Sequence, residues 1–150
     1  MGNIFICYRR DDSRDVSDRI FSELRRHFSR KRVFKDVNNI PPGVNFKTYI
    51  EAELKKSAVM LAIIGPNWLS KNADGLRRLD DPADLVSVEI STALGLQMRI
   101  IPVLVGGAKM PPRDMLPATL GTLADLHATT VRSDPDFDGA PPSAPFLRFC

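Results

Sequence analysis

The segment that most constrains the fold is an unbroken apolar run, Ala58-Val-Met-Leu-Ala-Ile-Ile64, in the middle of the chain. A strand with one face in water alternates apolar and polar residues, whereas a strand covered on both faces is apolar throughout. Strands of the second kind occur in parallel sheets with helices packed on each side. Gly65 and Pro66 follow directly and end the run. We therefore expect residues 58–64 to form a strand inside a parallel sheet.

Four other segments have the composition of strands. They comprise residues 3–7, 32–35 and 100–105, together with a weaker strand within residues 123–131. Pro102 falls inside the third of these segments, and proline cannot donate a hydrogen bond to a strand ladder. We therefore expect that strand to lie toward an edge of the sheet or to be irregular.

Three helices are predicted between the strands, because apolar residues recur there every four positions. They cover residues 13–28, 46–57 and 82–94, and a shorter helix is expected at residues 116–120. Asp12 or Ser13 is the expected cap of the first helix, and Asp81 followed by Pro82 is a favourable start for the third. Strands that alternate with helices predict a doubly wound α/β fold with helices on both faces of the sheet.

The chain length and composition suit a single domain. Its 150 residues fit one hydrophobic core, while residues 133–150 are rich in Pro, Asp and Gly, so we divide the chain into a domain at 1–132 and a tail or linker at 133–150. No apolar run approaches the roughly 20 residues of a membrane helix. Cys7 and Cys150 provide neither a disulfide framework nor a metal-binding spacing, which favours a reducing, cytoplasmic setting.

Doubly wound sheets bind ligands at the carboxyl ends of their strands, where the strand order switches. If the order is the flavodoxin-like 2-1-3-4-5, the loops at the switch point are Tyr8-Arg9-Arg10-Asp11 and Gly65-Pro66-Asn67-Trp68. The first loop brings two guanidinium groups, which suit phosphate. The second brings the only Trp of the chain, which suits stacking on a ring. Together with a carboxylate from the helix after the third strand, two arginines and an aromatic side chain there predict a dinucleotide site.

Glu89 is the only charged residue between Asp84 and Arg99, and it lies in a helix whose other residues are largely apolar. None of the residues three or four positions away from it on that helix can neutralise it. Its carboxylate must therefore be solvated, paired with another segment, or used for chemistry. The helix follows the third strand, so Glu89 could face the same crevice as the two loops.

The common motifs of nucleotide chemistry are absent. No G-x-G-x-x-G follows the first strand, and no G-x-x-x-x-G-K-[ST] occurs, so hydride transfer and P-loop phosphoryl transfer have little support. His27 and His127 are isolated, which argues against a Ser-His-Asp triad. A phosphoacceptor receiver domain would need paired acids after the first strand and an Asp at the end of the third. Here the first strand is followed by Tyr8-Arg9-Arg10 and the third ends in Ile64-Gly65, which argues against this class.

Several short pieces nevertheless occur in a specific order. They are Ile4-Phe-Ile-Cys-Tyr-Arg-Arg10, Phe34-Lys-Asp36, Ile40-Pro-Pro-Gly43, Phe46, the run at residues 58–64, Pro66-Asn-Trp68, Leu79-Asp-Asp-Pro82, Val88-Glu-Ile90 and Ile100-Ile-Pro-Val-Leu104. Over about residues 3–132 the chain resembles a bacterial Toll/interleukin-1 receptor (TIR) domain. This resemblance implies a flavodoxin-like sheet of about five strands in the order 2-1-3-4-5.

The resemblance also implies a function and a set of site residues. Many bacterial TIR domains cleave NAD⁺ at the nicotinamide–ribose bond, with NAD⁺ as substrate and no separate cofactor. The residue that matches the family's catalytic carboxylate is Glu89, and Tyr8, Arg9 and Arg10 match its first-strand loop. Asp36 to Phe46 matches the so-called BB loop, which borders the cofactor and reorders on assembly. Other members are adaptors that hold signalling complexes together and catalyse nothing.

Two features depart from the family pattern. Many relatives carry an aromatic residue four positions before the catalytic Glu, where this chain has Leu85, so Trp68 could supply the stacking instead. Relatives also usually end with a helix, and residues 133–150 do not have that pattern. A missing final helix would expose a flank of the sheet or leave it for a partner or a following domain.

Each candidate residue also has a purely structural interpretation. Trp68 could be a packing residue, and Phe46 could be the first core residue of its helix. Arg9 and Arg10 could form salt bridges with Asp11, Asp12 or Asp36. The basic residues between 25 and 35 are interpreted as a solvated helix end, with cations well placed for the helix dipole, rather than as a nucleic-acid surface.

The combined prediction is a cytoplasmic TIR-domain NAD⁺ glycohydrolase of bacterial defence signalling. Glu89 is the predicted catalytic residue, and no metal site is expected. Tyr8, Arg9, Arg10, Asp36, Phe46 and Trp68 are the predicted NAD⁺-binding residues. The expected partners are NAD⁺, further copies of the domain and a fused or separate sensor or effector domain, with neither membrane nor nucleic acid among them. The alternative is a non-catalytic protein-interaction module that uses the Asp36–Phe46 loop.

Overall fold

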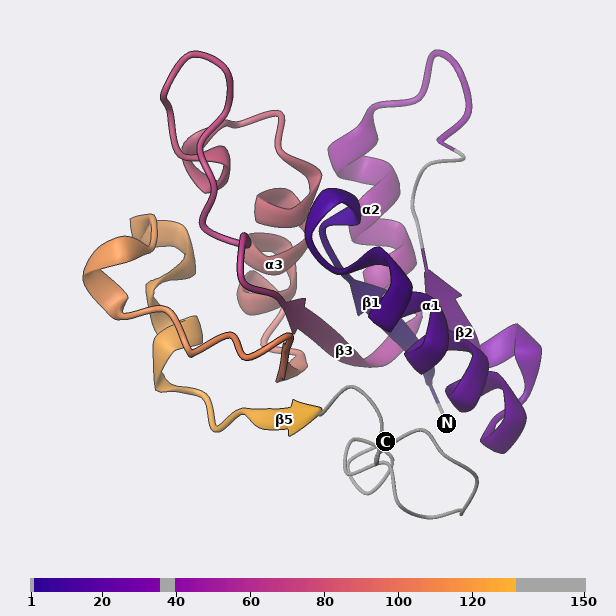
Figure 1. Cartoon of the computed structure of the whole chain (residues 1–150). Coiled ribbons are helices and arrows are strands. Elements are labelled where there is room, and N and C mark those ends of the chain that lie inside the picture. The colour runs from indigo at the N-terminus through magenta and orange to yellow at the C-terminus, as the bar shows by residue number, and fades with distance from the viewer. Residues whose placement is uncertain (1, 36–39, 132–150) are drawn as a thin grey trace.

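Five parallel strands form a single sheet in the computed structural model, which describes residues 2–35 and 40–131 (Figure 1). The strands are β1 (Asn3–Cys7), β2 (Val33–Lys35), β3 (Ser57–Ile64), β4 (Arg99–Val105) and β5 (Thr129–Val131). Their order across the sheet is β2-β1-β3-β4-β5, and each neighbouring pair is parallel. The predicted flavodoxin-like class and strand order are therefore confirmed.

Three α-helices and several short 3₁₀-helices connect the strands. The α-helices are α1 (Arg10–His27), α2 (Phe46–Lys55) and α3 (Leu85–Gly95), and the 3₁₀-helices are η1 (Arg30–Arg32), η2 (Arg78–Asp80), η3 (Arg113–Met115) and η4 (Ala118–Asp125). The short helix expected at residues 116–120 is thus a longer 3₁₀-helix. It follows Pro117, whose fixed φ suits the start of a helical turn.

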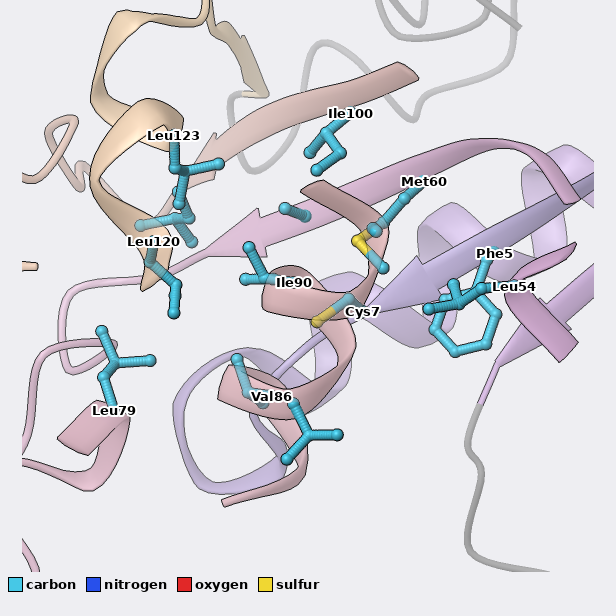
Figure 2. Close-up of a cluster of buried hydrophobic side chains, with 14 of the residues drawn as sticks. Phe5, Cys7, Leu54, Met60, Leu79, Val86, Ile90, Ile100, Leu120 and Leu123 are labelled. Carbon is cyan, nitrogen blue, oxygen red and sulfur yellow. The ribbon is translucent and has the colours of Figure 1, made fainter. Parts of the chain in front are cut away.

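Helices cover both faces of the sheet and create two hydrophobic clusters. On one face α2, α3 and η4 pack against Phe5, Cys7 and Met60, as Figure 2 shows. On the other face α1 contributes its fully buried Ile20 and Leu24. All residues of β3 from 59 to 64 are buried, which is the two-sided covering that the apolar run predicted.

The first helix begins earlier than the sequence indicates. α1 starts at Arg10, with a non-helical backbone at Ser13 (φ −145°, ψ 28°), and its N-cap, Arg9, makes no side-chain capping bond. The Asp12 carboxylate instead accepts hydrogen bonds from the backbone N–H groups of Gly65 at 2.9 Å and Asn67 at 2.6 Å. Asp12, one of the two predicted caps of this helix, thus binds the backbone at the end of β3 instead. Ser13, the other, lies at the kink that divides α1.

The third helix begins later than predicted. Its N-cap is Asp84, whose carboxylate accepts a hydrogen bond from the backbone N–H of Ser87 at 3.2 Å. The Asp81 carboxylate accepts from the backbone N–H of Ala83 at 2.9 Å and so belongs to the preceding turn. Asp81 and Pro82 therefore do not start α3, because a better-placed aspartate three residues later satisfies the free N–H groups of its first turn.

Of the two positions expected for Pro102, edge-ward or irregular, the strand pairing agrees with the edge-ward one. β4 pairs with β3 over Arg99–Leu104, but β5 pairs only with Val103, Leu104 and Val105. Pro102 thus precedes the part of β4 that has a strand on its outer side. In the described part of the chain, no helix has the length and apolar character needed to cross a bilayer. The predicted tail at 133–150 lies outside the described residues.

Candidate functional site

A cavity of about 360 Å³ opens beside the carboxyl end of β1. The loop from β1 to α1 forms one wall with Tyr8, Arg9 and Arg10, and the start of α3 forms the other with Asp84, Leu85 and Glu89. β1 and β3 are the strands at which the chain order reverses, so the cavity occupies the place where sheets of this class bind ligands. Four residues singled out in the sequence, namely Tyr8, Arg9, Arg10 and Glu89, thus line one cavity.

Glu89 lines the cavity from α3 and is only 6% exposed. Its neighbours in the chain, Val88 and Ile90, are buried as well, because α2 packs on one side of this helix and η4 on another. The solvated interpretation of Glu89 is therefore excluded. A buried carboxylate needs a hydrogen-bond partner, and the Cys7 thiol at the end of β1 lies close enough to Glu89 for this carboxylate to raise the pKa of Cys7.

The Cys7 thiol is 1% exposed and lies in the core cluster on the α3 side of the sheet. Burial raises the pKa of Cys7 well above its ordinary value, and the neighbouring Glu89 carboxylate raises this pKa further through its charge and their hydrogen bond. The nearby Arg9 guanidinium acts in the opposite direction. Cys7 is therefore a protonated thiol at neutral pH.

Arg9 is 2% exposed and forms a two-pronged ion pair with Asp84. Its Nη1 lies 2.8 Å from Oδ1 and its Nη2 lies 3.1 Å from Oδ2. Since Asp84 also caps α3, this pair fastens the start of the Glu89 helix to the end of β1. The structural interpretation of Arg9 as a salt-bridged residue agrees with this geometry, but the partner is Asp84 rather than Asp11, Asp12 or Asp36.

Two cations on the cavity wall remain closer to solvent than Arg9. Arg10 is exposed at the first position of α1, and Arg78 is half-buried in η2. The Nη1 of Arg78 lies 2.6 Å from Oδ2 of Asp11, which links η2 to the first turn of α1. Sequence reasoning missed Arg78 because it falls in a polar segment without periodicity, and its position between strand 3 and the Glu89 helix was the only available signal.

Two further predicted site residues, Trp68 and Phe46, do not line this cavity. Trp68 is 1% exposed in the core cluster formed with α2, α3 and η4, so its ring faces are covered by protein and the packing interpretation fits. Phe46 is the first residue of α2 and packs half-buried against the same cluster. Asp36 lies outside the described residues, so its predicted role stays a prediction.

A second, larger cavity of about 490 Å³ lies on another side of α3, between that helix, α2 and the segment that leads into η4. Glu51, Ser87 and Thr119 are among its lining residues, but neither Glu89 nor any arginine is. Of these two cavities among the described residues, only the one beside β1 combines the buried Glu89 carboxylate with arginines. Among the described residues, no group of three His, Cys, Asp or Glu side chains is arranged to hold a metal ion.

The fold and site thus define a flavodoxin-like α/β domain with a polar cavity at the switch point of its sheet. The profile of the TIR domain family matches residues 4–141, and the chain therefore belongs to the TIR domain family. A solved structure with a similar fold is that of the TIR domains in the activated Roq1 resistosome directly recognizing the pathogen effector XopQ. It has a TM-score of 0.62 and 11% sequence identity, and the match covers 87% of this chain and 88% of that one. A search of curated proteins finds no match.

Proposed function

We propose that this TIR domain is an NAD⁺ glycohydrolase that cleaves the bond between nicotinamide and ribose. The observation that carries the proposal is the buried Glu89 carboxylate on the wall of a cavity at the switch point of the sheet. Keeping a carboxylate there costs stability, and the family resemblance matches this residue to the catalytic Glu. Arg10 and Arg78 line the same cavity and supply positive charge for the diphosphate.

A single carboxylate is sufficient for this reaction. Most glycosidases pair one carboxylate with an acid that protonates the leaving oxygen. Nicotinamide in NAD⁺ is already a cationic leaving group, so no acid is required. Glu89 would stabilise the positive charge that develops on the ribose as the bond breaks. The electrostatic effect of this carboxylate is larger in a buried site than in water.

The bond that breaks leaves its electron pair on the pyridine nitrogen, and neutral nicotinamide departs. Capture of the ribose by water gives ADP-ribose and releases one proton. Capture by a nucleophilic group of the same molecule gives a cyclic product. Both outcomes use NAD⁺ as the substrate and need no further cofactor.

We further propose that activity depends on self-association and serves defence signalling in the cytoplasm. In relatives the site is completed by a neighbouring subunit, and the similar Roq1 TIR domains were solved in an activated resistosome. The cavity here is bounded by α1, η2 and α3 of one chain and is open to solvent. A second copy or a fused sensor domain would close it.

The test is to incubate the assembled protein with NAD⁺ and to identify the products by chromatography and mass spectrometry. We expect Glu89→Ala and Glu89→Gln to lower the rate by about 100-fold or more, because each removes the charge that stabilises the transition state. Glu51→Gln is the matched control, since Glu51 is a carboxylate that lines only the larger cavity, and it should retain the wild-type rate.

Two results would contradict the proposal. One is equal NAD⁺ consumption by wild type and Glu89→Ala, and the other is no consumption by assembled wild type. The second result, combined with binding to a partner that is lost when Pro42 or Gly43 is changed, would indicate a non-catalytic interaction module instead.

A further inference from the structure

The basic residues around the end of α1 fall into two groups according to their partners. Arg26 forms an ion pair with Glu23 at 3.1 Å, and Lys35 forms one with an aspartate of the same helix. Arg25 and Arg30 differ from them, because neither has an ion-pair partner among the described residues. The end of α1 therefore carries two guanidinium groups with which no described carboxylate pairs.

Both of these arginines line one cavity of about 280 Å³ beside the end of α1. The other lining residues are Ser22 and Arg26, so three guanidinium groups and a hydroxyl surround the space, and no described carboxylate does. Ser22, Arg25 and Arg26 share one face of the helix because they are three and four positions apart. Arg30 comes from η1, after the chain has left the helix.

The Arg25 side chain is held in place before any ligand binds. Its guanidinium carbon lies 4.9 Å from the centroid of the Phe21 ring, which is a cation–π contact. Its Nε is buried, so its two terminal nitrogens are the donors that it can offer at the cavity. A side chain that is already ordered loses less conformational entropy when a ligand binds.

We propose that this cavity binds a small, multiply charged phosphate ligand, such as a phosphate monoester or a diphosphate. A guanidinium group presents parallel N–H donors that match two phosphate oxygens. Three such groups around one space repel one another, and a multiply charged anion between them turns that repulsion into attraction. The Ser22 hydroxyl supplies a further donor.

The proposed phosphate site is separate from the cavity that contains Glu89. Arg10 lines that cavity from the start of α1, whereas Arg25 lies near the end of the same helix. A rise of 1.5 Å per residue places the two arginines on the order of 20 Å apart. The phosphate site therefore goes beyond the proposed reaction and does not depend on it.

The surroundings of the site favour a small anion over a nucleic acid. A nucleic-acid surface needs cations that follow several phosphates along a strand. The neighbouring cavity on α1 shares Ser22, but two carboxylates, those of Asp18 and Glu23, line it beside Arg19. These carboxylates would repel a polyanion that extended along the helix.

The competing explanation is that the arginines only complement the helix dipole. Cations in the last turn of a helix are favoured without any ligand, and this accounts for Arg25 and Arg26. It does not account for Arg30, which lies outside the helix. Nor does it require three guanidinium groups to line one cavity without an acid.

The test is calorimetric titration of the full chain with inorganic diphosphate at low ionic strength and without NAD⁺. We expect Arg25→Gln and Arg30→Gln each to raise Kd about tenfold, as loss of one hydrogen bond to a charged group predicts. Arg25→Lys should raise it less, since lysine keeps the charge but not the paired donors. Arg14→Gln is the matched control, because Arg14 is an exposed arginine of α1 outside the cavity lining, and it should retain the wild-type Kd. Thermal unfolding verifies that each variant is folded.

Four results would overturn the phosphate site. The first is no binding by wild type, and the second is an equal loss of affinity in Arg14→Gln and Arg25→Gln, which would mean unspecific attraction. The third is binding that Arg10→Gln or Arg78→Gln abolishes and that Arg25→Gln and Arg30→Gln do not affect, which would place diphosphate in the Glu89 cavity.

The fourth is a single-stranded oligonucleotide that binds more tightly than diphosphate and loses affinity in Arg25→Gln, which would indicate a nucleic-acid surface instead. The titration contains no NAD⁺, so failure of the proposed function, seen as an inactive assembled wild type, and failure of the phosphate site are separate results.

Discussion

Charged side chains occupy two contrasting settings in this domain, the outer face of α1 and the carboxyl end of β1. On α1, Glu23 pairs with Arg26 at 3.1 Å and with His27 at 3.2 Å, and the Arg26 side chain is 74% exposed. At the end of β1, the Arg9 side chain is 1% exposed and its partner Asp84 is 10% exposed. The nitrogen–oxygen distances in the two settings are similar, but one set of ion pairs is exposed to solvent and the other is buried.

The difference shows how a charge is retained in each setting. Exposed ion pairs on a helix surface contribute about 0.2–1 kcal/mol, so residues there can exchange with little effect on stability. Buried charges are costly to desolvate and very costly to leave unpaired. The charges at the end of β1 are therefore interdependent, and their arrangement fixes α3 and Glu89 relative to the sheet.

The largest difference between the two settings is expected when the arginine of one ion pair in each setting is replaced by alanine. Arg9→Ala leaves Asp84 buried without its guanidinium, and we expect the free energy of unfolding to fall by about 3–5 kcal/mol. Arg26→Ala, the matched change on α1, should lower it by no more than about 1 kcal/mol. Urea denaturation of both variants measures the two values. Equal losses would mean that burial does not distinguish the two pairs.

A smaller loss of stability is expected from removal of the Asp12 carboxylate, which accepts hydrogen bonds from backbone N–H groups. Asp12→Ala removes the acceptor of two N–H groups at the end of β3, those of Gly65 and Asn67. The expected cost is about 1–3 kcal/mol, as for unsatisfied donors. Asp11→Ala is the control, because the Asp11 side chain is 68% exposed in its pair with Arg78. If thermal denaturation gives the same Tm for both variants, the hydrogen bonds of Asp12 do not stabilise the fold.

A third effect, absent at neutral pH, is a pH dependence that comes from Cys7. Burial raises the pKa of Cys7 in the folded protein, while the unfolded thiol titrates near its ordinary value of about 8.5. Below that pH the thiol is protonated in both states, so the full stability is present. At higher pH the unfolded chain loses its proton first, and the free energy of unfolding falls by up to about 1.4 kcal/mol per pH unit until the folded thiol titrates.

Comparison of Cys7→Ala with wild type, both with Cys150→Ser, isolates this effect. Denaturation curves recorded from pH 7 to pH 10 should converge as the pH rises, because only the wild type carries the Cys7 thiol. Curves that stay parallel over this range would show that the thiol pKa is the same in both states.

The sequence was informative where a signal was local. The apolar run at 58–64 predicted the two-sided burial of β3, and the absence of any charge near Glu89 along its helix pointed to an unusual carboxylate. The ends of α1 and α3 could not be predicted in the same way. Asp12, in the first turn of α1, and Asp84, the cap of α3, bind partners 53 and 75 positions away in the chain.

Trp68 illustrates a second limit. An indole at the end of a central strand suits ligand stacking as well as core packing, and residue type does not separate the two. Packing against α2, α3 and η4 decides the matter, and that arrangement depends on the whole fold. The polar segment that carries Arg78 likewise did not reveal that this residue belongs to the site. The position of Arg78 depends on individual contacts such as that with Asp11, which the sequence does not show.

The hydrogen bond from the Gly65 backbone N–H to the Asp12 carboxylate has a consequence for how the cavity changes shape when a ligand binds. A Cβ at Gly65 would lie 2.5 Å from Oδ2 of Asp12, so a side chain there would displace the Asp12 carboxylate, which links the first turn of α1 to the end of β3. The opposite rim, at η2, is attached to this wall through the exposed pair of Arg78 and Asp11. We therefore expect only one side of the cavity to move when different ligands bind. The rim at η2 shifts, while the wall that carries Arg9 keeps its position.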